Sequence, residues 1–403
     1  MNIVKIEKIA YGGKGLGRLD GKVCFVENAL PGETVEIEII RDKKNLIEAR
    51  AINIESPSTA RENPPCPYYG SCGGCQYQHM TYFEELRWKE IQIREALQKQ
   101  LSLADEIFLP IVGSSNPYHY RNHITLHDAK NGWGFVDEDN QSTIAIQSCL
   151  IAKKELNAWL AKDRRPETED KGLDPRLRGD DKHKIQTTNY ARQTIRVGAG
   201  GKVTTSAEDI FFNLPIGDVR LRTHSRCFFQ ANLEITLKIA EKVKVLYEKL
   251  RPDHFWDLYA GVGTFTVLIH PRLSQILCVE SSASGVEALE MNLKNLGLAA
   301  EIAPEEVENC LADILAEERQ GPVFAILDPP RIGLHPAVIE ALCSGKGPNT
   351  IAYLSCHMGA LGRDLKALGE RAYSVESIQA FDMFPRTKHI ETLVFLRKRK
   401  TTD

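Results

Sequence analysis

The chain has 403 residues, more than one ordinary domain holds, so two or three units with separate cores are expected. Its net charge of −3 gives no overall positive field, so a polyanion such as RNA must be bound by local patches. It has no run of about 18 apolar residues, and its start, MNIVKIEKIA, lacks the charged-then-apolar order of a secretory signal. These features argue against a membrane or secreted protein, and we expect a soluble, cytoplasmic one.

The first segment reads as short strands separated by turn signals. TVEIEII places Val35, Ile37 and Ile39 on one face and two glutamates on the other, which is the period of two typical of half-buried strands. A small all-β barrel is therefore expected over residues 1–56. The stretch SPSTARENPP, rich in serine and proline, marks its boundary with the next unit.

The loop CPYYGSCGGCQYQH follows that boundary and holds Cys66, Cys72 and Cys75. These cysteines are too close together, and too lined with glycine, to be ordinary core residues. In a reducing compartment, ten scattered cysteines argue against a disulfide framework and for metal binding or catalysis by some of them. The sequence therefore predicts that the cysteines of this loop bind a metal or a metal-containing group.

A helix is expected directly after the cysteine loop. TYFEELRWKEIQIREALQKQL places Leu86, Ile93 and Leu97 near a period of 3.6 residues. Strand-like alternation then returns and ends at QSCLI, which contains Cys149. We take 57–219 as a central α+β unit.

Inside that unit, residues 162–184 change character. They contain two lone leucines and no aromatic residue, too little apolar surface to fold alone, and we interpret them as a flexible insertion. A basic tether for RNA is the alternative, but acidic residues almost cancel the basic ones.

The last unit, 220–403, has an α/β pattern. The apolar runs FWDLY, ILCVE, FAILD and IAYLS alternate with helical stretches, which is typical of parallel strands covered on both faces. VESIQAFDMF and ETLVFLRKRK are expected to form a final antiparallel pair at the edge of the sheet.

Three of these strands end in residues that can carry chemistry. DLYAGVGTF places glycines after a buried strand, and Glu280 ends the next one, where a carboxylate can accept hydrogen bonds from a ribose. The pair favours a cofactor that contains a nucleoside; the plain alternative is a tight turn beside a solvated glutamate. Asp328 in LDPPRIGLH lies at the same rim.

YLSCHMG adds Cys356 to this rim. A thiolate readily adds to an electron-poor ring carbon, although a cysteine here can also be merely packed. Cations that could lower the pKa of this thiol are Arg331, His357 and Arg363. Glu391, in FPRTKHIETLVF, could supply a base or be a solvated strand end.

The motifs FFQAN, DLYAGVGTF, LDPPRIG, YLSC and FDMFPRTKHIET, in this order, resemble the S-adenosylmethionine-dependent RNA 5-methyluridine methyltransferases. The first unit resembles a TRAM domain, an OB-like barrel that binds RNA. The cysteine loop resembles the 4Fe-4S loop of one branch of that family, which would make Cys149 the fourth ligand beside Cys66, Cys72 and Cys75. The implied catalytic unit is a class I, Rossmann-like methyltransferase domain.

The resemblance also implies roles for single residues. Positions that match the family's cofactor-binding residues are Gln230, Tyr259, Glu280 and Asp328; Cys356 matches the nucleophile and Glu391 the general base. This chain departs from the family at His357 and Met358, where asparagine and proline are usual. An acidic residue that contacts adenine stays unassigned between Glu305 and Glu306.

The expected reaction is methylation of uracil carbon 5 in RNA through a covalent adduct between Cys356 and carbon 6, on a uridine flipped out of its stack. The expected substrate is 23S ribosomal RNA, with transfer RNA as the alternative, and the expected state is a monomer without an obligate protein partner. A catalytically inactive RNA-binding relative is a further alternative because of His357 and Met358.

Three rivals use other chemistry. Four cysteines can bind zinc instead of iron and sulfide. Radical enzymes that cleave S-adenosylmethionine need C-x3-C-x2-C, whereas this loop is C-x5-C-x2-C with a candidate fourth ligand. Methyltransferases that act on exocyclic amines have an aromatic residue after two prolines, where this chain has Arg331.

Overall fold

The computed structural model describes residues 2–129, 132–138, 141–162 and 192–400. The predicted insertion therefore lies outside the described residues, apart from Lys162. Among the described helices, none combines the length and the apolar character that crossing a membrane requires.

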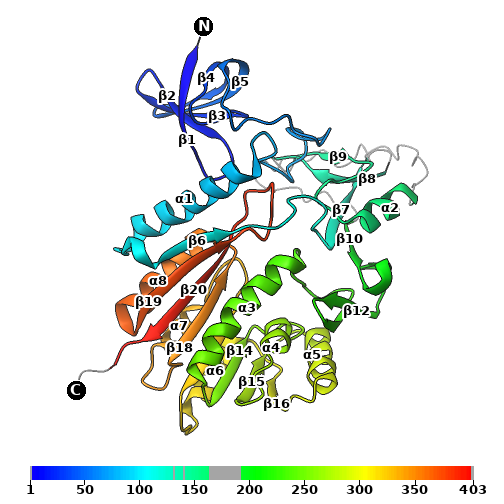
Figure 1. Cartoon of the computed structure of the whole chain (residues 1–403), viewed down its shortest axis with the longest axis vertical. Helices are drawn as coiled ribbons and strands as arrows, with labels where there is room; N and C mark the ends of the chain where they lie inside the picture. The colour runs from blue at the N-terminus through cyan, green and yellow to red at the C-terminus, as the bar shows by residue number, and fades with distance from the viewer. Residues whose placement is uncertain (1, 130–131, 139–140, 163–191, 401–403) are drawn as a thin grey trace, which may run out of the picture.

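The N-terminal strands form a closed barrel in the order β1-β2-β3-β5-β4, at the top of Figure 1. Its strands are β1 (Ile3–Ile9), β2 (Gly15–Leu19), β3 (Lys22–Glu27), β4 (Thr34–Asp42) and β5 (Leu46–Ser56). Val35 and Ile37 lie in the barrel core as predicted, but the prediction for Ile39 is wrong, since it is 37% exposed. The β4–β5 register shifts between Ile39 and Arg41, and the second half of β4 runs out past the core.

The long helix α1 (Tyr82–Gln100) follows the cysteine loop and begins at Thr81, whose hydroxyl accepts a hydrogen bond from the Glu84 amide. After it come a short 3-10 helix and β6 (Phe108–Val112). A five-stranded sheet with the order β11-β10-β7-β8-β9 then forms the rest of the central region. The strands of this sheet are β7 (His123–Ala129), β8 (Gly132–Val136), β9 (Thr143–Ala145), β10 (Arg192–Val197) and β11 (Val203–Thr205). The helix α2 (Lys154–Lys162) lies between β9 and β10 in the chain.

A β-hairpin of β12 (Phe211–Ile216) and β13 (Val219–His224) leads into an eight-stranded sheet with the order β16-β15-β14-β17-β18-β20-β19-β6. Its strands are β14 (His254–Leu258), β15 (Gln275–Val279), β16 (Ala300–Ala303), β17 (Val323–Leu327), β18 (Thr350–Ser355), β19 (Tyr373–Phe381) and β20 (Glu391–Lys398), besides β6. The five strands from β16 to β18 are parallel, as the apolar runs predict.

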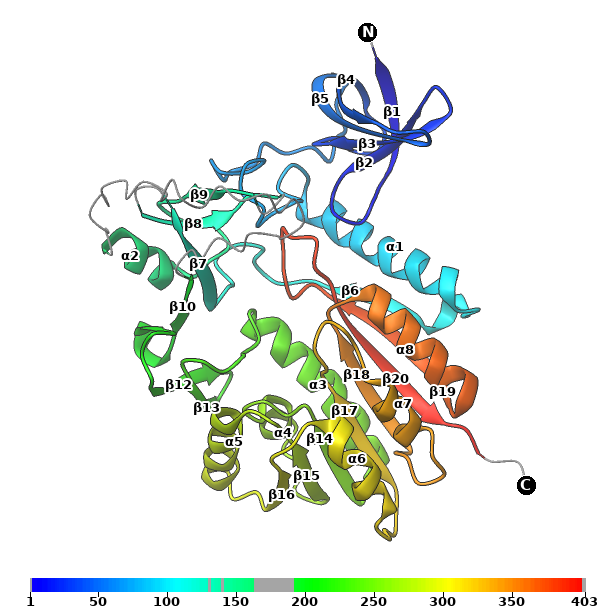
Figure 2. The same cartoon turned by 180° about the vertical axis from the view of Figure 1, so that it is seen from behind.

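Helices cover both faces of this sheet, and Figures 1 and 2 show the two layers. One face packs on α3 (Leu233–Leu250), α4 (Thr264–Ile269) and α5 (Ala283–Asn295). The other packs on α6 (Val307–Ala316), α7 (Pro336–Leu342), α8 (Met358–Arg371) and the C-terminal half of α1.

The antiparallel pairing of β19 with β20 is confirmed, but their expected position at the edge is wrong. The edge strand is β6, which pairs parallel to β19. Ile93 and Leu97 of α1 and Phe108 of β6 pack in the same core as α8. Part of the region predicted as central is therefore built into the eight-stranded sheet and its core.

Candidate active site

Four of the predicted site residues each come first after a parallel strand of the large sheet. Tyr259 follows β14, Glu280 follows β15, Asp328 follows β17 and Cys356 follows β18. Because the carboxyl ends of parallel strands meet at one edge of a sheet, these side chains converge there. One cavity is lined by all four, together with Gln230 and Glu391.

Glu391 reaches this edge on an antiparallel strand. In the pairing of β18 with β20, Ser355 lies opposite Thr392. The next residue after Ser355 is Cys356, and the residue before Thr392 is Glu391, so the register brings thiol and carboxyl to the same end of neighbouring strands. The thiol and the expected base therefore share one side of the cavity.

The turn after β14 is built for close approach of a ligand to the backbone. Tyr259, Gly261 and Gly263 all have positive φ, at 74°, 56° and 80°. Both carboxylate oxygens of Glu280 accept backbone hydrogen bonds, from Gly261 N at 2.8 Å and Ser282 N at 2.7 Å. The turn and the acidic strand end are thus fixed to each other.

An adjoining cavity shares Tyr259 and Glu280 and is also lined by Glu305 and Glu306. Glu305 Oε1 accepts hydrogen bonds from Glu306 N at 3.0 Å and Asn309 Nδ2 at 3.2 Å. Both acidic candidates for the adenine contact therefore lie beside the expected cofactor cavity.

The opposite half of the main cavity holds two carboxyl groups, of which Glu391 is buried and Asp328 is half-buried. Asp328 Oδ2 accepts a hydrogen bond from Gln230 Nε2 at 2.9 Å. Burial raises the pKa of Asp328 to about 7, with a further rise from Asp257 and an opposing effect of Gln230. Burial and the charge of Asp328 raise the pKa of Glu391 well above its ordinary value. Once one of the two carboxyl groups has ionised, its negative charge disfavours ionisation of the other, which keeps its proton to a higher pH.

Glu391 Oε1 is buried and has no hydrogen-bond partner within the part of the chain that the structure describes. An unpaired buried acceptor is costly unless a ligand satisfies it. In its ionised form, the carboxylate is therefore suited to receive a proton from a bound molecule.

Cys356 lies between Glu391 and the N-terminus of α8. Burial raises the pKa of its thiol to about 11; Glu391 adds to that rise and Arg331 opposes it. Of the expected cations, Arg331 lines the cavity. Arg363 instead donates hydrogen bonds to Asp364 and to the Ile332 carbonyl.

The departure at His357 and Met358 has a local explanation. His357 is the N-cap of α8, and its Nδ1 accepts a hydrogen bond from Ala360 N at 3.1 Å. Met358 opens the helix and packs against the core on that side of the sheet. The helix after Cys356 therefore begins normally without asparagine and proline.

Sequence reasoning gave no role to Tyr11, which is 47% exposed in the loop between β1 and β2. Gly13 in the same β1–β2 loop lies so close to Gln76 that a Cβ would be 2.8 Å from the Gln76 carbonyl oxygen. The Ile9 and Ala10 carbonyls accept hydrogen bonds from Gln92 of α1. Burial raises the pKa of Tyr11, Arg331 opposes that rise and Cys356 adds to it. YGGKGLGR indicated only a turn.

The four predicted cluster cysteines lie together. Cys66, Cys72, Cys75 and Cys149 are free thiols that line a second cavity. Burial raises the pKa of Cys72 to about 11, and the charges of Cys149 and Cys66 add to the rise. Among the described residues, no group of three or more His, Cys, Asp or Glu side chains is arranged to hold a metal ion, so the predicted metal site is not confirmed.

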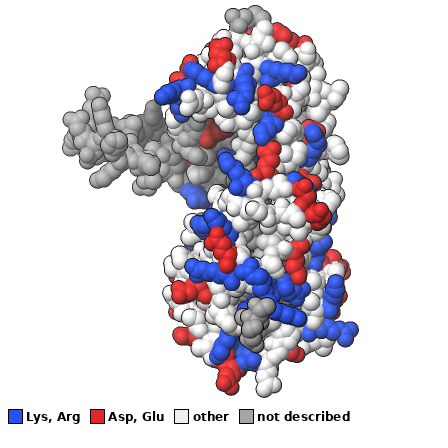
Figure 3. Space-filling model, turned by 90° about the vertical axis from the view of Figure 1, so that its left-hand side faces the viewer, with Lys and Arg blue, Asp and Glu red and all other residues white. Residues whose placement is uncertain are grey.

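Surface charge is uneven despite the small net charge. On the face in Figure 3, lysine and arginine gather around the end near the C-terminus, whereas charges of both signs mix over the upper half. The molecule therefore has a local positive patch, which a protein with a net negative charge needs in order to bind a polyanion such as RNA.

Comparison with known proteins gives two family matches. Residues 178–399 match the model of the tRNA (Uracil-5-)-methyltransferase family, and residues 3–52 match the TRAM domain. An uncharacterized RNA methyltransferase of Bacillus cereus is 29% identical, over 98% of this chain and 96% of that protein. One of Aquifex aeolicus is 28% identical over 97% of each.

The fold also has a close counterpart among solved structures. The Pyrococcus abyssi tRNA (uracil-54, C5)-methyltransferase in complex with S-adenosyl-L-homocysteine superposes with a TM-score of 0.70. It is 23% identical, and the match covers 98% of this chain and 100% of that one. The likeness shows that the two proteins share the whole arrangement of barrel, central region and catalytic sheet.

Proposed function

Because the chain belongs to the tRNA (uracil-5-)-methyltransferase family, we propose that it transfers a methyl group from S-adenosylmethionine to carbon 5 of a uridine in RNA. The observation that carries this proposal is the single cavity lined by Gln230, Tyr259, Glu280, Asp328, Cys356 and Glu391. The first four would bind the cofactor, and the last two would act on the base. The TRAM match and the local positive surface support RNA as the partner.

Carbon 5 of uracil is too weak a nucleophile to take a methyl group directly. The Cys356 thiolate adds to carbon 6, the ring becomes an enolate, and carbon 5 then takes the methyl group from the cofactor, which leaves as S-adenosylhomocysteine. Glu391 removes the carbon 5 proton, the bond from carbon 6 to sulfur breaks, and the thiolate is released. The unpaired, buried Glu391 oxygen on the same side as the thiol supports this division of roles.

Two substitutions test these roles because they block different steps. Cys356→Ala should give neither product nor a covalent complex. Glu391→Gln should accumulate methylated RNA joined to Cys356, seen as a denaturation-resistant band that carries label from the cofactor methyl group. RNA with 5-fluorouridine should trap the unmutated enzyme in the same way, since fluorine cannot leave as a cation. Normal turnover by Glu391→Gln, or an adduct on another cysteine, would contradict the assignment.

The proposed substrate is 23S ribosomal RNA, and transfer RNA is the second candidate. The barrel and the cysteine loop support the first, through the resemblance to the cluster-bearing branch. The likeness to the Pyrococcus abyssi tRNA enzyme supports the second. Mapping 5-methyluridine in both RNAs from cells that lack this protein decides between them, and no methyl transfer to bulk RNA would identify an inactive RNA-binding relative.

We also propose separate roles for the three units: residues 1–56 bind RNA, residues 57–219 bind the cluster and residues 220–403 transfer the methyl group. The insertion at 162–184 is proposed to be dispensable for this activity. The protein is proposed to act as a monomer in the cytoplasm. The cysteine cavity fits a 4Fe-4S cluster by its chemistry. Four thiols line it, and the Gly74 amide donates a hydrogen bond to Cys72 Sγ at 3.4 Å. A Cβ on Gly74 would lie 3.4 Å from the same sulfur, so the loop approaches the thiol closely.

Such a cluster would be held by Cys66, Cys72, Cys75 and Cys149, and with four thiolates it leaves no iron open for chemistry. Protein purified without oxygen should be brown, with about four irons and four sulfides per chain. Cys149→Ser should lose iron as fully as Cys72→Ser. A colourless protein with stoichiometric zinc would overturn the iron-sulfur assignment, and a normal cluster in Cys149→Ser would place the fourth ligand elsewhere.

A further inference from the structure

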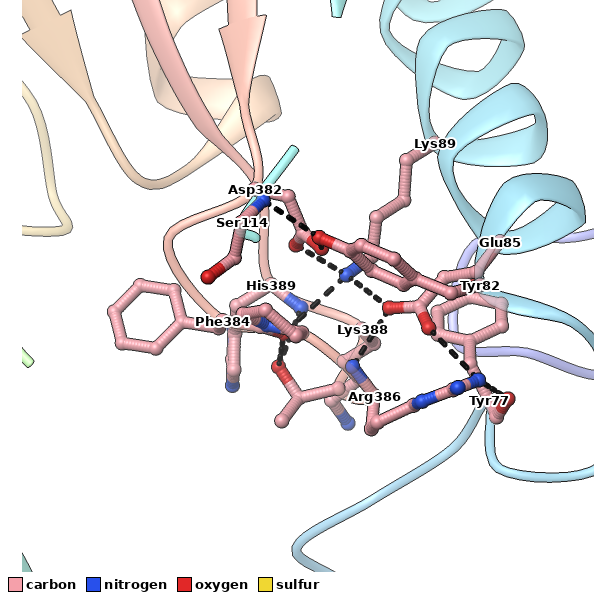
Figure 4. A network of polar contacts seen from close by, with 12 residues as sticks. Tyr77, Tyr82, Glu85, Lys89, Ser114, Asp382, Phe384, Arg386, Lys388 and His389 are labelled. Carbon is pink, nitrogen blue, oxygen red and sulfur yellow. Dashed lines mark hydrogen bonds and ion pairs between the residues drawn. The ribbon is translucent and has the colours of Figure 1, made fainter. Parts of the chain in front are cut away.

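The loop between β19 and β20, residues 382–390, is anchored largely by groups outside its own strands. Figure 4 shows it against α1 and the chain that follows the cysteine loop. Asp382 begins the loop and accepts hydrogen bonds from Lys89 Nζ and from the Tyr82 hydroxyl, both at 2.7 Å. At its far end, Lys388 N donates to Gln76 Oε1 at 2.9 Å. The conformation of this loop therefore depends on α1 and on Gln76.

Lys89 is at the centre of these contacts and is fully buried. Its ammonium group has three donors, and each finds an acceptor: Glu85 Oε1 at 2.7 Å, Asp382 Oδ1 at 2.7 Å and the Phe384 carbonyl at 3.3 Å. The Glu85 and Asp382 side chains are 0% exposed. Two of the three acceptors belong to the loop, so the ammonium group fixes its first turn.

Arg386 completes the arrangement from within the loop. Its backbone has φ of 68°, a left-handed conformation that is strained for a non-glycine residue. Its amide donates to Glu85 Oε1 at 2.7 Å, its guanidinium donates to the Met80 carbonyl at 2.8 Å, and its carbonyl accepts from Gln76 N at 2.9 Å. With Arg386, the buried set has two cations and two carboxyl groups, and its charges balance when Glu85 is ionised; burial raises the pKa of Glu85 to about 7, and Lys89 opposes that rise.

Both ends of this loop meet at the proposed base. Phe381, the last residue of β19, lies opposite Glu391, the first residue of β20. Phe384, whose carbonyl Lys89 binds, lines the same cavity as Cys356 and Glu391. A shift of the loop would therefore move the floor of the cavity and the start of the strand that carries Glu391.

Stability alone is a poor reason for this arrangement. A buried ion pair often contributes no more to stability than apolar side chains of similar volume, because its charges must first be removed from water. A buried polar group whose donors are all paired does, however, specify one conformation of the groups that it holds, and the Lys89 ammonium is such a group, although Glu85 Oε2 and Arg386 Nε have no hydrogen-bond partner among the described residues. Fixing Glu391 is a benefit that an apolar cluster at this place would not supply.

We propose that Lys89 is a positioning residue for the proton-removal step, holding the loop 382–390 so that the Glu391 carboxyl faces carbon 5 of the bound uracil. The inference rests on the proposed function, because it assigns Lys89 to the step in which Glu391 acts. Since methyl transfer needs Cys356 and the cofactor but not the base, Lys89 affects the later of the two chemical stages.

The double variant Lys89→Met/Asp382→Asn tests this. It removes one positive and one negative charge, so the buried set stays balanced, and Glu85 still accepts from the Arg386 amide. Misplacement of a reacting group by about 1 Å can cost about 100-fold in rate. We expect release of methylated RNA from the covalent adduct to slow by about 10- to 100-fold. Formation of the adduct should stay within about threefold, so methylated adduct accumulates on ordinary RNA.

The matched control is Lys8→Met/Glu95→Gln. It neutralises another ion pair anchored on α1, 2.9 Å long but 41% and 55% exposed. This control should leave formation and release of the adduct unchanged. Tyr82→Phe is a milder second variant, since it removes one hydrogen bond to Asp382 without changing charge, and it should slow release in the same sense if the double variant fails to fold.

The results separate the two levels of the proposal. If the unmutated enzyme forms no adduct with 5-fluorouridine RNA, the proposed function fails. If it forms that adduct but the Lys89 and Tyr82 variants lose formation and release in equal proportion, as partial unfolding would cause, the positioning role is overturned. Unchanged release in both folded variants overturns it as well.

Discussion

In the enzyme without RNA or cofactor, we expect the Cys356 thiol to be almost entirely protonated at neutral pH. Burial is the main cause of its raised pKa, about 11, and the nearby carboxyls of Glu391 and Asp328 add to it. Arg331 opposes this rise and lowers the pKa of the thiol. Arg331→Met should therefore raise the pKa and reduce the thiolate fraction at any given pH, whereas Glu391→Gln should do the opposite.

The size of the effect follows from the tenfold change in thiolate per pH unit. At pH 8, three units below a pKa of about 11, about one thiol in a thousand is ionised. A nearby opposite charge shifts a pKa by about one unit or more when it is close, and by less when it is exposed to solvent, as Arg331 is. Loss of Arg331 should therefore slow reactions of the thiolate by about three- to tenfold.

The rate of Cys356 carbamidomethylation by iodoacetamide, followed by mass spectrometry of its peptide, measures this fraction. Between pH 7 and 10 the logarithm of the rate should rise by about one per pH unit. Arg363→Met is the matched control, because Arg363 lies nearby but is bound to Asp364 and the Ile332 carbonyl. Glu391→Gln should speed the reaction most at alkaline pH, where the wild-type carboxyl is ionised.

Two results would refute this reasoning. A plateau of the wild-type rate below pH 9 would mean that the free thiol is already activated. Equal slowing by Arg331→Met and Arg363→Met would mean that Arg331 has no particular influence on the thiol. The first result would also mean that activation of the thiol does not depend on the binding of RNA and cofactor.

Three further changes probe the walls of the site. Gly13→Ala should lower the free energy of unfolding by about 1–3 kcal/mol, measured by urea titration, because its Cβ would clash with Gln76; Gly12→Ala, with nothing within 4 Å, should cost only the strain of its positive φ. Tyr11→Ala should raise the KM for RNA more than it lowers kcat, provided that Tyr11 contacts RNA and not the reacting atoms. Glu280→Gln should weaken binding of S-adenosylmethionine in equilibrium dialysis, and unchanged binding would exclude a ribose contact.

The sequence predicts the cavity well because each of its groups has a local signal. Tyr259, Glu280, Asp328 and Cys356 directly follow apolar runs that become parallel strands, and parallel strands end at one edge. The alternation that predicts the barrel holds for the first half of β4, where the residues face the core. It fails at Ile39, because a register shift between neighbouring strands leaves no signal in either strand alone.

The remaining features depend on contacts between distant parts of the chain. β6 pairs with β19, although some 270 residues separate Phe108 from Ile378, its partner in the register. On α1, hydrophobic spacing identifies Ile93 and Leu97 as buried, as the structure shows, but treats polar residues that precede them, such as Lys89, as solvent-facing. Lys89 is buried because Asp382, 293 residues away, meets it there. No pattern within one helix indicates such a partner.

These long-range contacts give the cysteine loop a mechanical connection to the site. Gln76 and Tyr77 follow Cys75 directly, and both donate backbone hydrogen bonds to the Arg386 carbonyl. Gln76 also lies close to Gly13 in the loop between β1 and β2 of the barrel. Gln76, the residue that contacts both the loop 382–390 and the β1–β2 loop, is directly next to Cys75 in the chain. A group bound by Cys75 would therefore lie one residue away from both contacts. By fixing the segment after Cys75, such a group would stabilise the conformation of both loops without taking part in electron transfer. A cluster with four thiolate ligands and no open iron suits this structural role.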